Sequence, residues 1–343
     1  MSSSADSAQQ RVVIVIGPGR SGTSTVAGTL QHLGLTVPGP AIKGNKTNPS
    51  GFFEPRWVVD FHRRLLDRAV VHTLDPSPAA LERATKAAAR PAARDRLRRW
   101  LSDRLAETPQ LIVKDPRTVW FRDLWVETAE ELGVSPGFVT MLRHPAEVSG
   151  SRQKYYAKSD PSMLRSDDVF RVAGWINVAL IAEQVSRGSQ RRFVRYTDLI
   201  KDWRRVMGEV QSSLDLSYDP GVDVSPHPVD AFVDPSLHRV QVDWDDVQVP
   251  ASLRDIGEGV WQSLVSIADG EDEESAVAKL EGVRQEYAVV DADAEAIARQ
   301  AIHRARIDAR RNANRTAKSG SGKRVEPVAA GRSVWRKLTG GRT

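Results

Sequence analysis

Residues 11–24 of the chain read RVVIVIGPGRSGTS. The continuous run of β-branched side chains at 12–16 is typical of a strand buried on both faces of a parallel sheet. GPGRSGTS then matches the spacing G-x-x-x-x-G-x-S/T of a phosphate-binding loop. Apolar side chains at Val26, Leu30 and Leu33 follow at the spacing of a helix. The stretch therefore predicts a strand, a phosphate loop and a helix in succession.

The rest of the chain repeats this alternation of strand and helix. Short apolar runs predict further strands at 111–113, 138–142 and 192–195, and helical patterns occupy the sequence between them. We expect an α/β fold in which helices flank a parallel sheet.

Composition divides the chain into four segments. An acidic cluster at 270–275 precedes a long Ala-, Glu- and Arg-rich stretch, and a Ser- and Gly-rich stretch follows. The expected segments are a disordered lead-in at 1–10, an α/β domain at 11–268, a charged helical extension at 269–318 and a flexible basic tail at 319–343.

Charge and residue usage exclude several classes of protein. The net charge is +5, but residues 299–343 hold 13 Lys/Arg against 2 Asp/Glu, so the remainder of the chain is mildly acidic. We therefore expect no nucleic-acid partner. The chain has no cysteine, which excludes disulfides and thiolate–metal sites. No apolar run reaches the roughly 20 residues of a membrane span, and the polar start does not resemble a signal peptide. A cytoplasmic location is expected, with possible peripheral contact at the inner face of the membrane.

The phosphate loop departs from that of nucleotide kinases. Thr23 stands where those enzymes have the lysine that contacts the β- and γ-phosphates, and Arg20 lies three positions earlier. In LIVKDPR, residues 111–117, a lysine interrupts the apolar run before Asp115. The loop is therefore suited to bind a phosphate group without the Mg²⁺-dependent nucleoside-triphosphate chemistry of kinases. A P-loop small-molecule kinase remains the alternative.

The loop resembles that of sulfotransferases that use 3′-phosphoadenosine 5′-phosphosulfate (PAPS). The resemblance rests on a basic residue directly before Ser-Gly-Thr, and it implies that Arg20 reaches the bridging oxygen and the sulfuryl group. It also implies PAPS as donor, no metal, and binding of the 5′-phosphosulfate by the loop residues Gly19, Arg20, Ser21, Gly22, Thr23 and Ser24.

The same family has an arginine at a later strand end and a serine eight residues on. FVTMLRHPAEVSGSR supplies Arg143 and Ser151 at this spacing. The resemblance assigns both to the 3′-phosphate that distinguishes PAPS from other adenylates. VKDPR (113–117), VRYTDL (194–199) and FVDPSLHR (232–239) resemble further segments more weakly. Tyr196, within the second of these, is as well explained by core packing as by nucleotide contact.

Sulfuryl transfer to a hydroxyl needs a base. NPSGFFEP, residues 48–55, resembles a segment of bacterial sulfotransferases and puts Glu54 forward as the catalytic base, beside Arg20. Asp60 and His62 are alternatives, whereas we expect Asp115 to be structural. The resemblance favours a carbohydrate or glycoconjugate hydroxyl as acceptor.

The basic tail has three open interpretations. It could contact an acidic surface, either anionic lipid headgroups or a polyanionic acceptor, it could dock on the acidic stretch 269–295, or it could have no partner. A further alternative to an enzyme is a non-catalytic nucleotide-binding protein in which the basic tail carries the function.

Overall fold

The computed structural model describes residues 10–46, 48–156, 161–233 and 242–318. The chain divides into two compact units, residues 1–291 and 292–343. The predicted flexible tail at 319–343 and nearly all of the predicted lead-in lie outside the described residues, as does most of FVDPSLHR.

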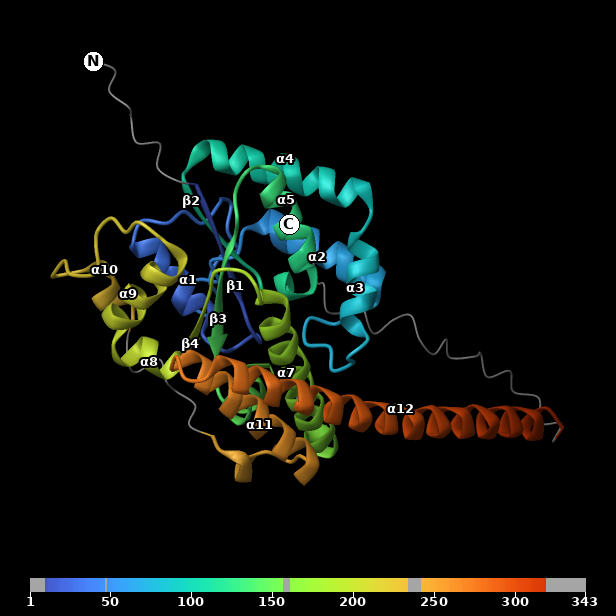
Figure 1. The fold of residues 1–343 in the computed structure, drawn as a ribbon. Helices are drawn as coiled ribbons and strands as arrows, with labels where there is room; N and C mark the ends of the chain where they lie inside the picture. The colour runs from blue at the N-terminus through green and yellow to red at the C-terminus, as the bar shows by residue number, and fades with distance from the viewer. Residues whose placement is uncertain (1–9, 47, 157–160, 234–241, 319–343) are drawn as a thin grey trace, which may run out of the picture. The chain divides into compact units, whose positions relative to one another are not determined.

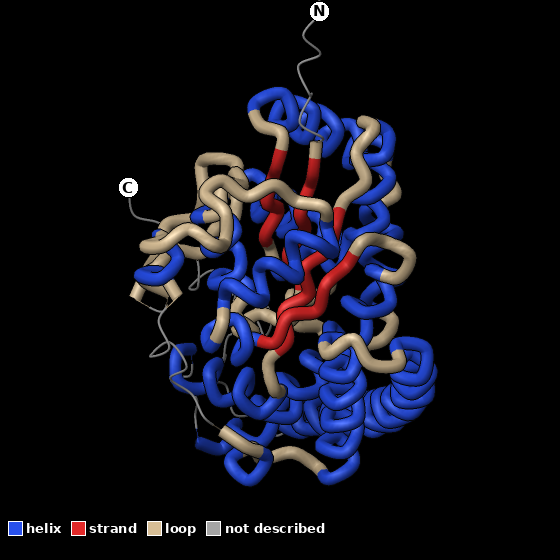
Figure 2. The backbone as a smooth tube through the Cα atoms, turned by 60° about the vertical axis from the view of Figure 1, so that its left-hand side comes forward, coloured by secondary structure: helices blue, strands red, loops and turns tan. Residues whose placement is uncertain are grey.

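A four-stranded parallel sheet lies at the centre of the first unit, in the order β2-β1-β3-β4 (Figures 1 and 2). β1 pairs with β2 on one side and β3 on the other. The expected parallel sheet is confirmed. Its strands are β1 Arg11–Ile16, β2 Gln110–Lys114, β3 Gly137–Leu142 and β4 Arg191–Arg195.

Helices cover both faces of this sheet (Figure 2). One apolar cluster joins the sheet to α2–α5, a second joins it to α1 and α8–α10, and a third lies around α6, α7, α11 and the start of α12. The α-helices are α1 Thr23–His32, α2 Arg56–Ala69, α3 Ala80–Ala88, α4 Pro91–Glu107, α5 Arg122–Glu131, α6 Pro145–Tyr156, α7 Leu164–Ser186, α8 Tyr196–Lys201, α9 Trp203–Leu214, α10 Pro228–Phe232, α11 Ala251–Ala268 and α12 Glu273–Lys318.

The central strand explains why both faces must be covered. Successive side chains of a strand point to opposite faces, and in β1 the side chains of Val12, Ile14 and Ile16 enter one cluster while those of Val13 and Val15 enter the other. All five are at most 1% exposed. Burial of each of these side chains contributes about 1.5–3 kcal/mol to the stability of the fold. The run is therefore stable only as the middle strand of a three-layer arrangement.

Helix boundaries follow local chemistry. α3 ends at Ala88, and Pro91 opens α4, where its missing N–H costs nothing. α8 and α9 are two separate helices, divided at Asp202. The Asp202 carboxylate accepts a hydrogen bond from the N–H of Arg205 and so caps α9.

The predicted charged extension is helical from Glu273, and its part up to residue 291 belongs to the first unit. Ala276, Leu280 and Tyr287 of α12 are buried. The Tyr287 hydroxyl lies 2.6 Å from the carbonyl of Pro76 and 3.0 Å from that of Ala173. The start of α12 is thus part of the core around α7.

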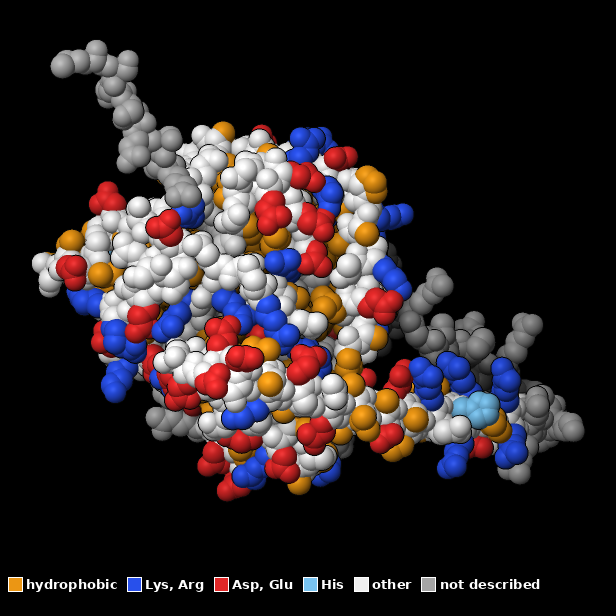
Figure 3. All heavy atoms as spheres, in the orientation of Figure 1, with side chains coloured by type: hydrophobic (Ala, Val, Ile, Leu, Met, Phe, Trp, Pro, Cys, Tyr) orange, Lys and Arg blue, Asp and Glu red, His pale blue; other side chains and the backbone are white. Residues whose placement is uncertain are grey.

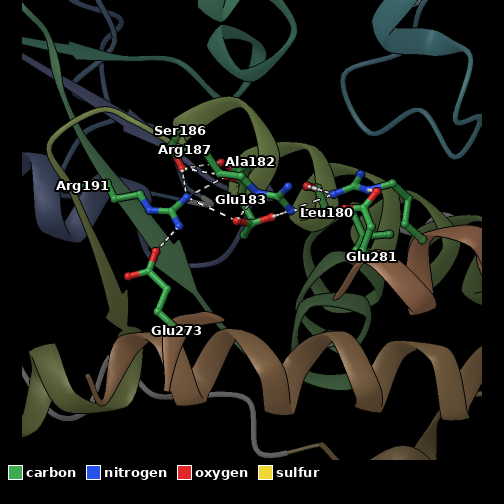
Figure 4. Close-up of polar contacts among 9 residues, drawn as sticks. Leu180, Ala182, Glu183, Ser186, Arg187, Arg191, Glu273 and Glu281 are labelled. Atoms are coloured by element: carbon green, nitrogen blue, oxygen red, sulfur yellow. Dashed lines mark hydrogen bonds and ion pairs between the residues drawn. The ribbon is translucent and has the colours of Figure 1, made fainter. Parts of the chain in front are cut away.

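Ion pairs complete this attachment (Figure 4). Glu183 of α7 is fully buried and accepts hydrogen bonds from Arg187, 2.8 Å away, and from Arg191 at the start of β4, 3.3 Å away. The same two arginines reach Glu281 and Glu273 of α12. A buried carboxylate needs such partners, and this one ties α12 to α7 and β4.

The described part of the second unit, residues 292–318, is a helix. Its side chains up to Ala313 are exposed or, at Ile307, half-buried. Figure 3 shows basic side chains gathered along this stretch, where the sequence has Arg299, Arg304, Arg306, Arg310 and Arg311. Among the helices in the described ranges, none combines the length and the apolarity that crossing a bilayer requires.

Candidate functional site

A cavity of about 480 Å³ opens at the carboxyl edge of the sheet. This volume falls in the ~300–1,000 Å³ range of small-molecule sites, and the carboxyl ends of parallel strands are where such folds bind ligands. The described residues that line it include four cationic side chains, Arg20, Lys114, Arg117 and Arg143, and one carboxylate, Glu54. The site therefore favours an anionic ligand.

The phosphate loop between β1 and α1 is held in an unusual backbone conformation. Gly22 has φ +91°, and a Cβ added there would lie 2.3 Å from a ring carbon of Tyr196, so only glycine fits. Arg20 also has a positive φ, 79°. A non-glycine residue adopts this conformation only where its surroundings compensate for the strain. Contacts with the surrounding structure, and not the intrinsic backbone preferences of its residues, therefore hold the loop in this conformation.

The start of α1 presents backbone hydrogen-bond donors that no side chain of the described residues caps. The helix begins at Thr23 with no side-chain cap and no acidic residue in its first turn. The backbone N–H groups of the first turn have no partner within a helix, and they carry its positive dipole end. Thr23, Ser24 and Thr25 all line the cavity. This end of α1 is suited to bind a phosphate or sulfate.

The two phosphate motifs expected from the sequence meet in space. Arg20 Nε donates to Ser151 Oγ at 3.1 Å, although the two residues are 131 positions apart. Arg143 Nη1 donates to the carbonyl of Arg20 at 3.3 Å. Arg143 also bonds Glu147 at 2.7 Å and lies over the ring of Tyr196, 4.9 Å from its centroid. The loop after β1 and the start of α6 therefore form one cationic corner.

A second charged pair lies on the other side of the loop. Lys114 Nζ, at the end of β2, is 2.6 Å from Glu54 Oε1 and 3.2 Å from Ser24 Oγ. The Lys114 side chain is 3% exposed and that of Glu54 12%. Asn48 also donates to Ser24 Oγ, at 3.1 Å. The candidate base is thus fixed beside the phosphate loop by a buried lysine.

His62 and Asp115 form a buried pair behind the cavity. His62 Nδ1 lies 2.9 Å from Asp115 Oδ2, and its Nε2 accepts a hydrogen bond from Trp125 Nε1, also at 2.9 Å. Burial alone would raise the pKa of Asp115, but the hydrogen bond from His62 and the charge of Arg117 outweigh it and hold that pKa below its ordinary value. Asp115 is structural, as expected.

The alternative base Asp60 and the strand-end residue His144 lie away from the cavity, whereas Tyr196 packs in the core beside it. Asp60 pairs with Arg63 on the exposed face of α2, 3.5 Å away. His144 contacts Glu258 and the rings of Trp244 and Trp261. Tyr196 is a core residue whose ring also lines the cavity, and burial raises the pKa of its hydroxyl. Neither Asp60 nor His144 lines the cavity.

The structure brings most of the expected site together. Gly19, Arg20, Gly22, Thr23, Ser24, Glu54 and Arg143 line the cavity. Ser151 reaches it through Arg20. Ser21 is fully buried, and its hydroxyl has no hydrogen-bond partner in the part of the chain that the structure describes. The ligands assigned to these residues stay predictions.

Sequence reasoning missed Lys114 and Arg117. A signal was present, because Lys114 continues an apolar strand, and a lysine is rarely buried without a partner. Its partner, Glu54, is 60 residues away in the sequence, so periodicity could not supply it. Among the described residues, no group of three or more His, Asp or Glu side chains could hold a metal ion.

The fold and site define an α/β protein whose cavity lies beside the glycine-rich loop between β1 and α1. Neither a protein-family model nor a curated protein matches the chain. Two solved structures are similar to it. A sulfotransferase domain from the Synechococcus PCC 7002 olefin synthase is 17% identical, with 75% of this chain and 95% of that domain aligned at a TM-score of 0.42. A sulfotransferase domain from the curacin biosynthetic pathway is 15% identical, with 76% and 99% aligned at the same TM-score. Similarity at this level assigns no function.

Proposed function

We propose that the chain is a sulfotransferase that moves a sulfuryl group from PAPS to an acceptor hydroxyl. The observation that carries the proposal is the contact of Arg20 with Ser151, with Arg143 beside it. These contacts bring the loop after β1, which is suited to bind one phosphate, next to the end of β3, which is suited to bind another. A donor with phosphates at both its 5′ and 3′ positions matches this pair of anion sites.

The residues fit such a donor. The uncapped start of α1 and Arg20 would hold the 5′-phosphosulfate, and the guanidinium of Arg143 would bind the 3′-phosphate. Contact with Ser151 and with the ring of Tyr196 would orient these arginines. A carbohydrate or glycoconjugate acceptor is proposed from the sequence resemblance alone.

Glu54 and Lys114 would serve the chemical step. The acceptor oxygen forms a bond to sulfur as the bond from sulfur to the 5′-phosphate oxygen breaks. Glu54 would take the acceptor proton, and the departing electron pair stays on the phosphate oxygen. Lys114, Arg20 and the N–H groups of α1 would stabilise that negative charge. The products are a sulfate ester and adenosine 3′,5′-bisphosphate.

Ligand affinity tests the proposal directly. Calorimetry should show that adenosine 3′,5′-bisphosphate binds about 10- to 100-fold more tightly than 5′-AMP, because a charge-assisted contact is worth about 1.5–3 kcal/mol. Arg143→Gln should remove most of this preference. Arg68→Gln, an exposed arginine of α2, is the matched control.

The alternatives give different results. Equal affinity for the two nucleotides in the unmodified protein would overturn the donor assignment. Magnesium-dependent turnover of ATP would favour the P-loop kinase. Bisphosphate binding without turnover on any acceptor would favour a non-catalytic binding protein. For a sulfotransferase of this kind, EDTA should leave turnover unchanged.

A further inference from the structure

A chain of buried hydrogen bonds ends at Arg117, an arginine that lines the cavity. Trp125 Nε1 donates to His62 Nε2 at 2.9 Å, and His62 Nδ1 lies 2.9 Å from Asp115 Oδ2. The other oxygen of Asp115 accepts from the backbone N–H of Arg117 at 3.0 Å and from Arg117 Nη1 at 2.8 Å. His62, Asp115 and Trp125 are fully buried.

The donors and acceptors of this chain have one consistent assignment. The indole N–H of Trp125 can only donate, so His62 Nε2 accepts and its proton sits on Nδ1. The neutral His62 then donates to Asp115, which stays ionised and faces the guanidinium of Arg117. Each buried group is satisfied, and a satisfied network of this kind is rigid. Arg117 is therefore held in one orientation.

Part of the Arg117 guanidinium remains available. Its side chain is 21% exposed and lines the cavity. Neither Nε nor Nη2 of Arg117 makes a hydrogen bond to any residue in the described ranges. Two N–H edges of a fixed arginine are thus free to meet a ligand.

The order of the strands places Arg117 away from Arg143, the residue proposed to bind the 3′-phosphate of the donor. β1 lies between β2 and β3. Arg143 follows β3, whereas Arg117 follows β2, so they lie on opposite sides of the phosphate loop. Glu54 pairs with Lys114 at the end of β2. An acceptor hydroxyl must reach Glu54, and so it approaches on the side of Arg117.

We infer that Arg117 binds an anionic group of the acceptor, so that this enzyme sulfates an acidic substrate. The inference rests on the proposed function. A carboxylate or sulfate presents paired oxygens that match the planar guanidinium. Trp125, His62 and Asp115 are positioning residues that set its angle, as supporting residues do around preorganised sites. An acidic sugar, either a uronic acid or a sulfated sugar, has this chemistry.

Binding to the product complex tests the inference without turnover. Protein saturated with adenosine 3′,5′-bisphosphate is titrated with methyl β-D-glucuronide and with methyl β-D-glucoside, and glucose 6-sulfate is compared with glucose. The acidic member of a pair should bind at least about tenfold more tightly. Preference in the first pair alone identifies a carboxylate, and preference in the second alone identifies a sulfate. Equal affinity, or no binding, within both pairs overturns the inference.

Variants of Arg117 complete the test. Arg117→Gln should abolish the preference and raise KM for an acidic acceptor about 10- to 100-fold while kcat changes little. Arg117→Lys should restore part of the affinity, because a cation is retained, and Arg68→Gln should change nothing. Unchanged preference in Arg117→Gln overturns the inference. Loss of bisphosphate affinity in that variant does so too, since it would make Arg117 a donor residue. If unmodified protein fails to bind the bisphosphate, the proposed function itself fails.

Discussion

Replacing Glu54 by glutamine separates its structural contribution from its chemical one. Glu54 Oε1 is 2.6 Å from Lys114 Nζ, and both side chains are largely buried. Glu54→Gln keeps the shape and removes the charge, so the Lys114 ammonium loses its ionic partner. Removing one member of a buried ion pair costs about 3–5 kcal/mol. We expect a value near the lower end, since Ser24 Oγ still accepts from Lys114.

The second change is Lys114→Met, alone and combined with Glu54→Gln. A buried ion pair replaced on both sides by neutral groups of similar size is often close to neutral in stability. The double variant should therefore recover most of the stability that Glu54→Gln loses. A cost of about 3 kcal/mol lowers the melting temperature by roughly 5–10 °C in a domain of this size. Differential scanning calorimetry measures each variant.

Activity should not follow stability. A general base contributes about 10²–10⁴-fold to rate, so Glu54→Gln should lose that factor in kcat and retain its affinity for adenosine 3′,5′-bisphosphate. The double variant should be at least as slow, although its stability returns, because it also lacks the Lys114 ammonium that we propose to stabilise the leaving phosphate. Release of the bisphosphate measures turnover. Recovery of turnover together with stability in the double variant would show that Glu54 has only a structural role.

Two further predictions concern acid stability and the basic tail. Asp115 has a pKa below its ordinary value of 3.8 in the fold, so its carboxylate stabilises the protein above about pH 4, and this contribution is lost as the pH falls towards the lowered pKa. Asp115→Asn should lower the urea midpoint at pH 7 and flatten its decline at pH 3–4; an unchanged decline would assign acid sensitivity to other groups. Removing residues 319–343, which hold six Lys/Arg and one Asp/Glu, should leave bisphosphate binding unchanged and weaken salt-sensitive binding to phosphatidylserine vesicles, at about 1 kcal/mol per basic residue. Full-length protein that ignores such vesicles at low salt would refute the membrane interpretation.

Local sequence determined the sheet and the phosphate loop. The run at 12–16 is apolar at every position, and only a strand covered on both faces buries all of it, which is where β1 lies. The loop glycines and the helical spacing after them are likewise local signals. They located Arg20 and the start of α1 because phosphate loops depend on consecutive backbone groups.

Helix ends were harder to predict from the sequence, because contacts of side chains in the folded protein can outweigh the local helix propensity. Asp202 ends one helix and caps the next, although the apolar spacing runs on across it. The start of α12 is fixed by Glu183, a residue that no pattern in the sequence links to Glu273 or Glu281.

Only the tertiary structure decided which charged groups meet. The sequence indicated Arg20, Glu54 and the Arg143/Ser151 motif as separate features. It held no reason to pair Glu54 with Lys114 or to bind Arg20 to Ser151. These contacts depend on β2 and β3 lying on either side of β1. The periodicity of a sequence shows which face of a helix or strand is buried. The order of the strands depends on how the long connections between them pack, and that information is spread over the whole core.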